Sequence, residues 1–143
     1  MPRSKTNPPS AKSATNAGTK KSLYQRVGGY DVIAGIIDDF LARHRANPQL
    51  ARFLSGRSAD SRRSARQMLV DQLAELCGGP CFYIGRDMKT SHAGLGITAS
   101  DWKASMNCLA ESLDQFKVPR KEKQEVLAIV EKLKREIVEL GVR

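Results

Sequence analysis

The two histidines, His44 and His92, are the side chains of this 143-residue chain best suited to metal binding or proton transfer. His92 lies close to the apolar residues Met88, Leu95 and Ile97, in a segment rich in glycine. An imidazole in such surroundings is either a hydrogen-bonded core residue or a single axial ligand of iron, because its neutral nitrogen binds iron well. The residues alone leave both interpretations open.

His44 comes near the end of a predicted helix, beside Arg45. A positive charge at that end of a helix interacts favourably with the helix dipole, so we expect His44 on the surface. Ser91 directly precedes His92. Because adjacent residues of a helix do not face each other, we expect Ser91 to point elsewhere, which disfavours a serine nucleophile activated by His92.

The three cysteines do not have the spacing of a zinc site. Cys77 and Cys81 flank Gly78-Gly79-Pro80, and Cys108 stands alone. Zinc sites typically contain paired Cys-x-x-Cys ligands, and covalent haem attachment uses Cys-x-x-Cys-His, which is absent here. We therefore expect the cysteines to be small buried side chains in a reducing compartment.

Charge is concentrated at the start of the chain. The formal net charge is +9, and residues 1–21 contain five basic residues and no acidic one. This segment also has no large apolar residue after Met1, so it cannot bury enough surface to fold. We expect a disordered basic tail over 1–21 and a folded domain over 22–143. A basic tail can attract nucleic acid, so a helical nucleic-acid-binding protein is one alternative, although the weakly basic body makes it the less favoured one.

Apolar residues recur at helical spacing through the folded domain, which predicts an all-α fold. Ser58 or Asp60 can cap one helix, and Thr98 with Asp101 forms a capping-box pattern before another. Residues 81–86 are expected to form a loop. The last helix is expected to be continuous, because its apolar residues keep their spacing as far as Leu140. The predicted helices cover 22–27, 31–46, 49–54, 58–76, 87–92, 98–116 and 119–140.

Several motifs together resemble those of the group I truncated haemoglobins, the short globins with a two-over-two helical arrangement. The resemblance extends from Leu23 to about Leu140. Its most specific part is the segment from Tyr83 to Ile97, which contains His92 between spaced glycines. The other matching segments are Leu-Tyr-Gln-Arg-Val-Gly-Gly over 23–29, Asp38-Asp39-Phe40 and Gly78-Gly79-Pro80.

The resemblance implies that His92 is the proximal ligand of a non-covalently bound haem b, with Met88 one helical turn before it. It also implies a pocket of apolar side chains around the cofactor. The four arginines between positions 57 and 66 are then candidates for its propionates, while a solvated face is the simpler interpretation of this run. The expected pocket residues are Phe40, Leu69, Leu73, Met88, Ile97 and Trp102.

The distal side of the pocket departs from the family pattern. The residue after Phe40 is usually a tyrosine that donates a hydrogen bond to the bound gas, and here it is Leu41. In the next long helix, Ala65 and Leu69 are expected to point toward the sixth iron position. A polar residue on the same helix is expected to replace the missing tyrosine, and the candidates are Arg66, Gln67 and Gln72.

The function implied is reversible binding of a diatomic gas (oxygen, nitric oxide or carbon monoxide), serving oxygen transport or nitric-oxide dioxygenation. The second of these needs a reductase as partner. We expect a cytoplasmic monomer or weak dimer without membrane insertion. A globin fold that has lost its haem and acts as a sensor or partner module is the remaining alternative.

Overall fold

The computed structural model describes residues 21–85 and 87–139, and all regular secondary structure in them is helical. The predicted all-α class is therefore confirmed. Apart from Lys21, the predicted tail over 1–21 lies outside the described residues. The elements are α2 (Leu23–Val27), α3 (Tyr30–Ala46), the 3-10 turn η1 (Ala51–Phe53), α4 (Ala59–Leu76), α5 (Met88–His92), α6 (Ala99–Gln115), α7 (Arg120–Glu131) and α8 (Lys134–Ile137).

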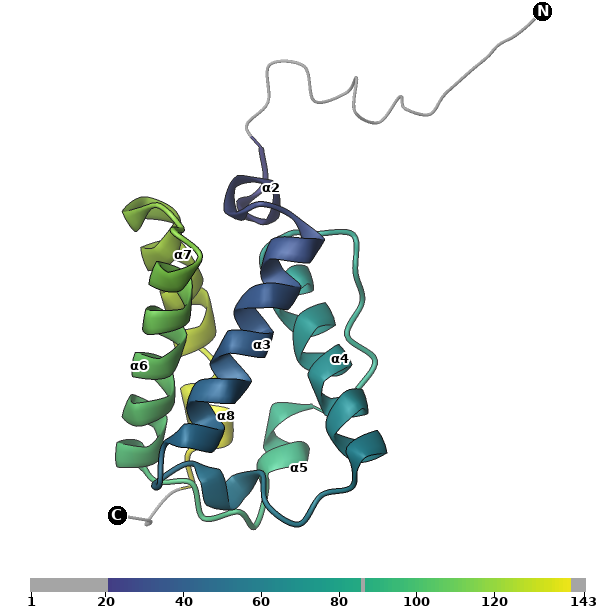
Figure 1. Ribbon diagram of the computed structural model, residues 1–143, viewed down its shortest axis with the longest axis vertical. Helices are drawn as coiled ribbons and strands as arrows, with labels where there is room; N and C mark the ends of the chain where they lie inside the picture. The colour runs from purple at the N-terminus through teal and green to yellow at the C-terminus, as the bar shows by residue number, and fades with distance from the viewer. Residues whose placement is uncertain (1–20, 86, 140–143) are drawn as a thin grey trace, which may run out of the picture.

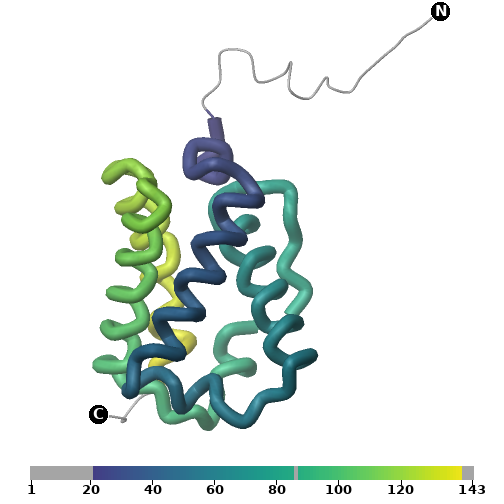
Figure 2. Tube along the Cα trace, in the orientation of Figure 1, coloured from purple at the N-terminus to yellow at the C-terminus, as the bar shows by residue number. Residues whose placement is uncertain are grey.

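Helix α3 occupies the middle of the molecule, with α6 on one side and α4 on the other (Figure 1). The α3–α4 pair and the α6–α7 pair form the two layers of a two-over-two helical sandwich. The tube in Figure 2 shows the short α5 at the end of the molecule opposite α2. Helix α8 returns to pack against α5. Residues of α5, including its last residue His92, line a cavity together with residues of the long helices α3, α4 and α6.

Side-chain caps fix where two of the long helices, α4 and α6, begin. Ser58 accepts a hydrogen bond from the backbone of Ser61, which settles the predicted choice between Ser58 and Asp60. The capping box of Thr98 and Asp101 is present as predicted. Such a cap satisfies backbone donors that the first helical turn leaves unpaired, and it typically contributes about 1 kcal/mol.

The Gly78-Gly79 pair ends α4 for two separate steric reasons. Gly78 has a φ of 88°, in the left-handed region that residues with a Cβ rarely adopt. Gly79 lies so close to the ring of Tyr24 that an added Cβ would collide with it. The backbone of Tyr24 also donates to the carbonyl of Cys77 at 2.8 Å. The two glycines therefore let the end of α4 turn directly against α2.

The prediction of one continuous last helix over 119–140 is wrong. Helix α7 ends at Glu131, and α8 begins at Lys134. Between them the backbone tightens, with Leu133 donating to the carbonyl of Val130 at 2.9 Å. Leu133 and Ile137 then pack on a cluster of Met88, Ile97 and Trp102. No proline or glycine marks this break, so packing outweighs the local helical preference. Leu140 lies outside the described residues.

None of the helices in 21–85 and 87–139 combines the length and the apolar character needed to cross a membrane.

Candidate cavity and its histidines

A cavity of about 510 Å³ opens between α3, α4, α5 and α6, and most of its lining is apolar. Its volume falls within the ~300–1,000 Å³ of typical small-molecule and cofactor sites. The histidine and all six pocket residues expected from the resemblance lie in its wall. These residues are His92, Phe40, Leu69, Leu73, Met88, Ile97 and Trp102.

The ring of His92 is oriented by its own helix. Nδ1 lies 2.9 Å from the carbonyl oxygen of Met88 and 2.9 Å from Oγ of Ser91. The expectation that Ser91 points elsewhere is therefore wrong, because its hydroxyl turns back onto the ring. With an Nδ1–H donated to the Met88 carbonyl, the lone pair is on Nε2. No described residue hydrogen-bonds Nε2, so that nitrogen remains available for a ligand.

This geometry is the one by which proteins prepare a histidine to bind a metal. A ligating histidine usually donates its other ring N–H to a carbonyl or carboxylate, which fixes both the tautomer and the ring orientation. In the described residues, no group of three or more histidine, cysteine, aspartate or glutamate residues is placed to hold a metal ion. A single ligand nitrogen suits a metal that brings its other ligands with it, as the iron of a haem does.

Only part of the expected distal set reaches the cavity. Leu41, Ala65 and Gln72 line it. The amide Nε2 of Gln72 lies 3.3 Å from the sulfur of Met88, so this group is directed toward the α5 side. Gln72 is thus the one candidate donor on α4 that the structure brings into the wall.

Arg66 and Gln67 are not in the cavity wall. Arg66 makes two hydrogen bonds to the carboxylate of Asp38 on α3, at 2.8 and 3.0 Å. Gln67 donates from Nε2 to the hydroxyl of Tyr30 at 2.6 Å and to Asp71 at 3.1 Å. Both side chains join α4 to the α3 side or to α4 itself, outside the cavity. Sequence spacing alone does not define how α4 is rotated about its axis relative to α3, so it could not predict which face of α4 these side chains occupy.

His44 is half-buried and faces the cavity, contrary to the expectation of a surface residue. It lines the same cavity as His92. Its Nε2 lies 2.9 Å from Oγ of Ser105 on α6, and its ring packs against Phe40 with centroids 4.4 Å apart. Burial lowers the pKa of His44 to about 4, because the apolar surroundings disfavour the charged form. The sequence did not predict the burial of His44, because the residue that packs against it, Ser105, lies on α6, far along the chain.

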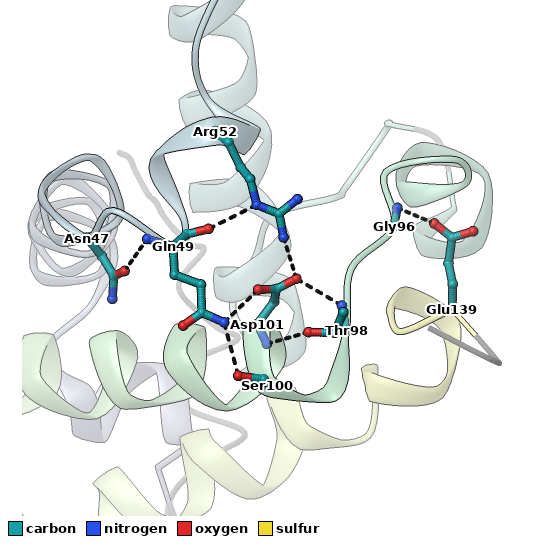
Figure 3. A network of polar contacts seen from close by, with 8 residues as sticks. All are labelled: Asn47, Gln49, Arg52, Gly96, Thr98, Ser100, Asp101 and Glu139. Atoms are coloured by element: carbon teal, nitrogen blue, oxygen red, sulfur yellow. Dashed lines mark hydrogen bonds and ion pairs between the residues drawn. The ribbon is translucent and has the colours of Figure 1, made fainter. Parts of the chain in front are cut away.

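At one edge of the cavity, a polar network joins η1 to the start of α6 (Figure 3). The buried carboxylate of Asp101 accepts hydrogen bonds from Gln49 at 2.7 Å, Arg52 at 2.8 Å and the backbone of Thr98 at 3.0 Å. Burial raises the pKa of Asp101, but these hydrogen bonds outweigh it and the net pKa is lowered. The network therefore fixes this edge with a carboxylate that stays ionised.

Basic side chains lie at the start of α4. Arg57 lines the cavity and is exposed, with Nε 3.1 Å from the hydroxyl of Ser61. Arg62 and Arg63 are exposed, and Arg63 pairs with Asp60. Only Arg57 of the basic run is therefore at the cavity wall.

The cysteines are free thiols in the structure. Burial raises the pKa of Cys77 to about 11, so its thiolate is disfavoured at neutral pH. A thiol in that state is a poor nucleophile and a poor metal ligand. The expectation of small buried side chains holds for Cys77 and Cys108, while Cys81 is partly exposed.

Comparison with known proteins agrees with this fold. Residues 22–139 match the model of the bacterial-like globin family. A group 1 truncated haemoglobin of Mycolicibacterium paratuberculosis is 33% identical over 116 residues, which cover 81% of this chain and 83% of the relative. The crystal structure of the Tetrahymena pyriformis truncated haemoglobin superposes with a TM-score of 0.76 at 21% identity, covering 82% of this chain and 98% of that one. The 2/2 haemoglobin of Synechococcus sp. PCC 7002, solved with covalently attached haem, gives a TM-score of 0.75 at 22% identity and covers 82% of this chain and 98% of that one. With its two-over-two sandwich and a family match over nearly all the described residues, this chain belongs to the group 1 truncated haemoglobins of the bacterial-like globin family.

Proposed function

We propose that the chain holds a haem b non-covalently through Nε2 of His92 and binds a diatomic gas in the cavity between α3, α4, α5 and α6. The single observation that carries this proposal is the orientation of His92. Its Nδ1 is engaged by the Met88 carbonyl at 2.9 Å, and its Nε2 has no partner among the described residues. The ring is thus prepared to give one nitrogen to one metal.

The cavity residues fit the group. The wall is mostly apolar, which suits the faces of a porphyrin, and the volume of about 510 Å³ is that of a cofactor site. Arg57 at the edge is a cation in reach of solvent, suited to the carboxylates that such a cofactor presents there. When bound, the iron supplies one open coordination position for a small gas molecule. The surrounding leucine, isoleucine and phenylalanine side chains exclude water from it.

Non-covalent attachment is proposed because the chain lacks Cys-x-x-Cys-His and the thiol of Cys77 is buried with a raised pKa. The Synechococcus relative shows that covalent attachment occurs in a protein of this fold. In this chain Nε2 of the other histidine, His44, is already engaged in a hydrogen bond with Ser105, which also disfavours a covalent bond from that nitrogen to the haem. Extraction of haem into acidified organic solvent distinguishes the two modes, since only a non-covalent haem leaves the protein.

The experiment that tests the proposal is an absorption spectrum of the full chain after titration with haem. We expect a Soret band that saturates at one haem per chain. His92→Gly should lose the band, and added imidazole should restore it, because free imidazole supplies the missing nitrogen. Ser91→Ala is the matched control: it removes a neighbour of the ring but leaves the ligand, so the band should remain. A wild-type chain without a Soret band would contradict the proposal and favour a haem-less module or a nucleic-acid-binding protein.

A further inference from the structure

His44 is placed with its ring in the cavity and near Leu41. The two residues are three positions apart on α3, so they are neighbours on one face of the helix, and both line the cavity. Helical side chains lean toward the N-terminus of their helix and cover the preceding turn. The contact of the His44 ring with Phe40 shows this lean directly. The imidazole therefore lies over the turn that contains Leu41.

Two other polar groups of the cavity wall, those of Gln72 and Asp101, are directed elsewhere. The amide of Gln72 contacts the sulfur of Met88, on the side of α5. The carboxylate of Asp101 is satisfied by the network shown in Figure 3, and it can only accept hydrogen bonds. His44 stands on the wall formed by α3 and α6. If His92 binds the iron, its sixth position faces the walls that α5 does not form.

Ser105 determines what the His44 ring can offer. At a pKa of about 4 the ring is neutral at physiological pH, so it has one N–H and one bare nitrogen. When the Ser105 hydroxyl donates to Nε2 across 2.9 Å, the ring proton is on Nδ1. No described residue accepts a hydrogen bond from Nδ1. An N–H without a partner in an apolar wall is a donor held ready for a small ligand.

We propose that His44, positioned by Ser105, is the hydrogen-bond donor to the gas ligand in this cavity. The proposal rests on the proposed function and adds the residue that selects among gases. A ligand that gains negative charge when bound, as oxygen does, is stabilised by such a donor. Carbon monoxide gains much less charge and is stabilised less. His44 would therefore favour oxygen over carbon monoxide.

The test compares His44→Leu with wild-type holoprotein, using the infrared stretch of bound carbon monoxide and the dissociation rate of oxygen. A nearby donor lowers the carbon–oxygen stretching frequency, so His44→Leu should raise it. Hydrogen bonds to charged acceptors correspond to roughly a 10- to 100-fold change in an equilibrium constant, and we expect oxygen release to quicken by about that factor. Carbon monoxide release should change by less than about threefold. Gln67→Leu is the matched control and should leave the stretching frequency unchanged, because Gln67 lies outside the cavity wall and donates to Tyr30.

Two further variants test the role of His44 even if His44→Leu fails to fold. His44→Gln keeps an N–H donor and should raise the frequency less than His44→Leu does. Ser105→Ala frees the ring and should broaden or split the band, because the tautomer is no longer fixed. An unmoved frequency in His44→Leu, with a normal Soret band, would overturn the role of His44 and leave haem binding intact. A missing Soret band in the wild type would overturn the proposed function, and this role with it.

Discussion

Arg66 on α4 and Asp38 on α3 form a two-point ion pair, with Nε–Oδ1 at 2.8 Å and Nη2–Oδ2 at 3.0 Å. The ion pair engages the guanidinium of Arg66, which the sequence spacing had made a candidate for contact with the gas ligand. It links α3 to α4 outside the cavity. We therefore expect Arg66 to act on stability and not on ligand binding.

Arg66→Ala tests this separation. Exposed ion pairs contribute about 0.2–1 kcal/mol to stability, so the free energy of unfolding measured in urea should fall by an amount in that range. The rate of oxygen release should stay within about twofold of the wild type. Arg62→Ala, which removes an exposed arginine of the same helix without this partner, is the control for general charge effects. A tenfold change in oxygen release in Arg66→Ala would mean that the side chain reaches the ligand.

Leu41 is expected to influence the rate of oxygen release, because its side chain lines the cavity at the position where the resemblance implies a tyrosine. Leu41→Tyr adds a hydroxyl donor, and oxygen release should slow by about one to two powers of ten. Leu41→Phe adds the ring without the hydroxyl and should leave the rate near the wild-type value. Stopped-flow measurement of oxygen release checks both. Equal slowing in the two variants would show that ring volume, and not hydrogen bonding, controls release.

His44 links stability to pH. Its pKa is lowered to about 4 in the folded chain, against about 6.5 in an unfolded one. Between these values the unfolded state binds a proton that the folded state does not, so the free energy of unfolding falls as pH drops from about 6.5 to about 4. The upper bound of this loss is roughly 3 kcal/mol, from about 1.36 kcal/mol per pKa unit.

The measurement is urea unfolding at pH 7 and pH 4.5 for the wild type and His44→Gln. The variant lacks the titrating group, so its stability should fall less over this range. The difference between the two proteins isolates His44 from carboxylates and from His92. Parallel pH curves for the two proteins would show that His44 keeps an ordinary pKa and is not desolvated.

Asp101 is predicted to stabilise the contact between η1 and α6. Asp101→Asn keeps the size of the side chain but removes the negative charge that accepts hydrogen bonds from Gln49, Arg52 and Thr98. We expect the free energy of unfolding to fall by about 1–2 kcal/mol at pH 7. Because the pKa of Asp101 is lowered in the fold, its contribution is complete above the unfolded-state value of ~3.9 and is lost as pH falls through the lower folded value. Thermal melts at pH 7 and pH 3 measure this. Ser100→Ala, at the exposed edge of the same network, should change little.

The basic tail gives a prediction that stays open. Deletion of residues 2–20 should lower the melting temperature by less than about 5 °C, the shift that roughly 1 kcal/mol produces in a domain of this size. The reason is their composition, which offers no large apolar side chain to the core. The same deletion addresses the nucleic-acid alternative. Salt-sensitive DNA binding by the full chain, lost on deletion, would support that alternative.

Local patterns predicted much of this molecule, because they act over a few residues. The cap at Thr98, the end of α4 at Gly78 and the apolar stripes that line the cavity all depend on spacing within one helix. What the sequence could not provide is the rotation of one helix against another. That rotation takes Arg66 and Gln67 out of the cavity and brings His44 into it, beside Ser105.

The break between α7 and α8 escaped prediction for a related reason. The apolar spacing through Val126, Val130, Leu133 and Ile137 suits an unbroken helix. The chain instead tightens after Glu131, whose carboxylate accepts a hydrogen bond from the indole of Trp102 at 3.1 Å. Leu133 and Ile137 reach the Met88 cluster only after that turn. A contact between residues nearly thirty positions apart outweighs the local pattern.

Because both histidines of the sequence face one cavity, the molecule has a built-in pair of reporters. Every imidazole resonance in a proton spectrum, and every histidine modified by diethyl pyrocarbonate, refers to one of these two half-buried rings in the cavity wall. One reporter is on α3 and the other on α5, on different walls. In the haem-free chain, the two reaction rates therefore report separately on how accessible each wall of the cavity is.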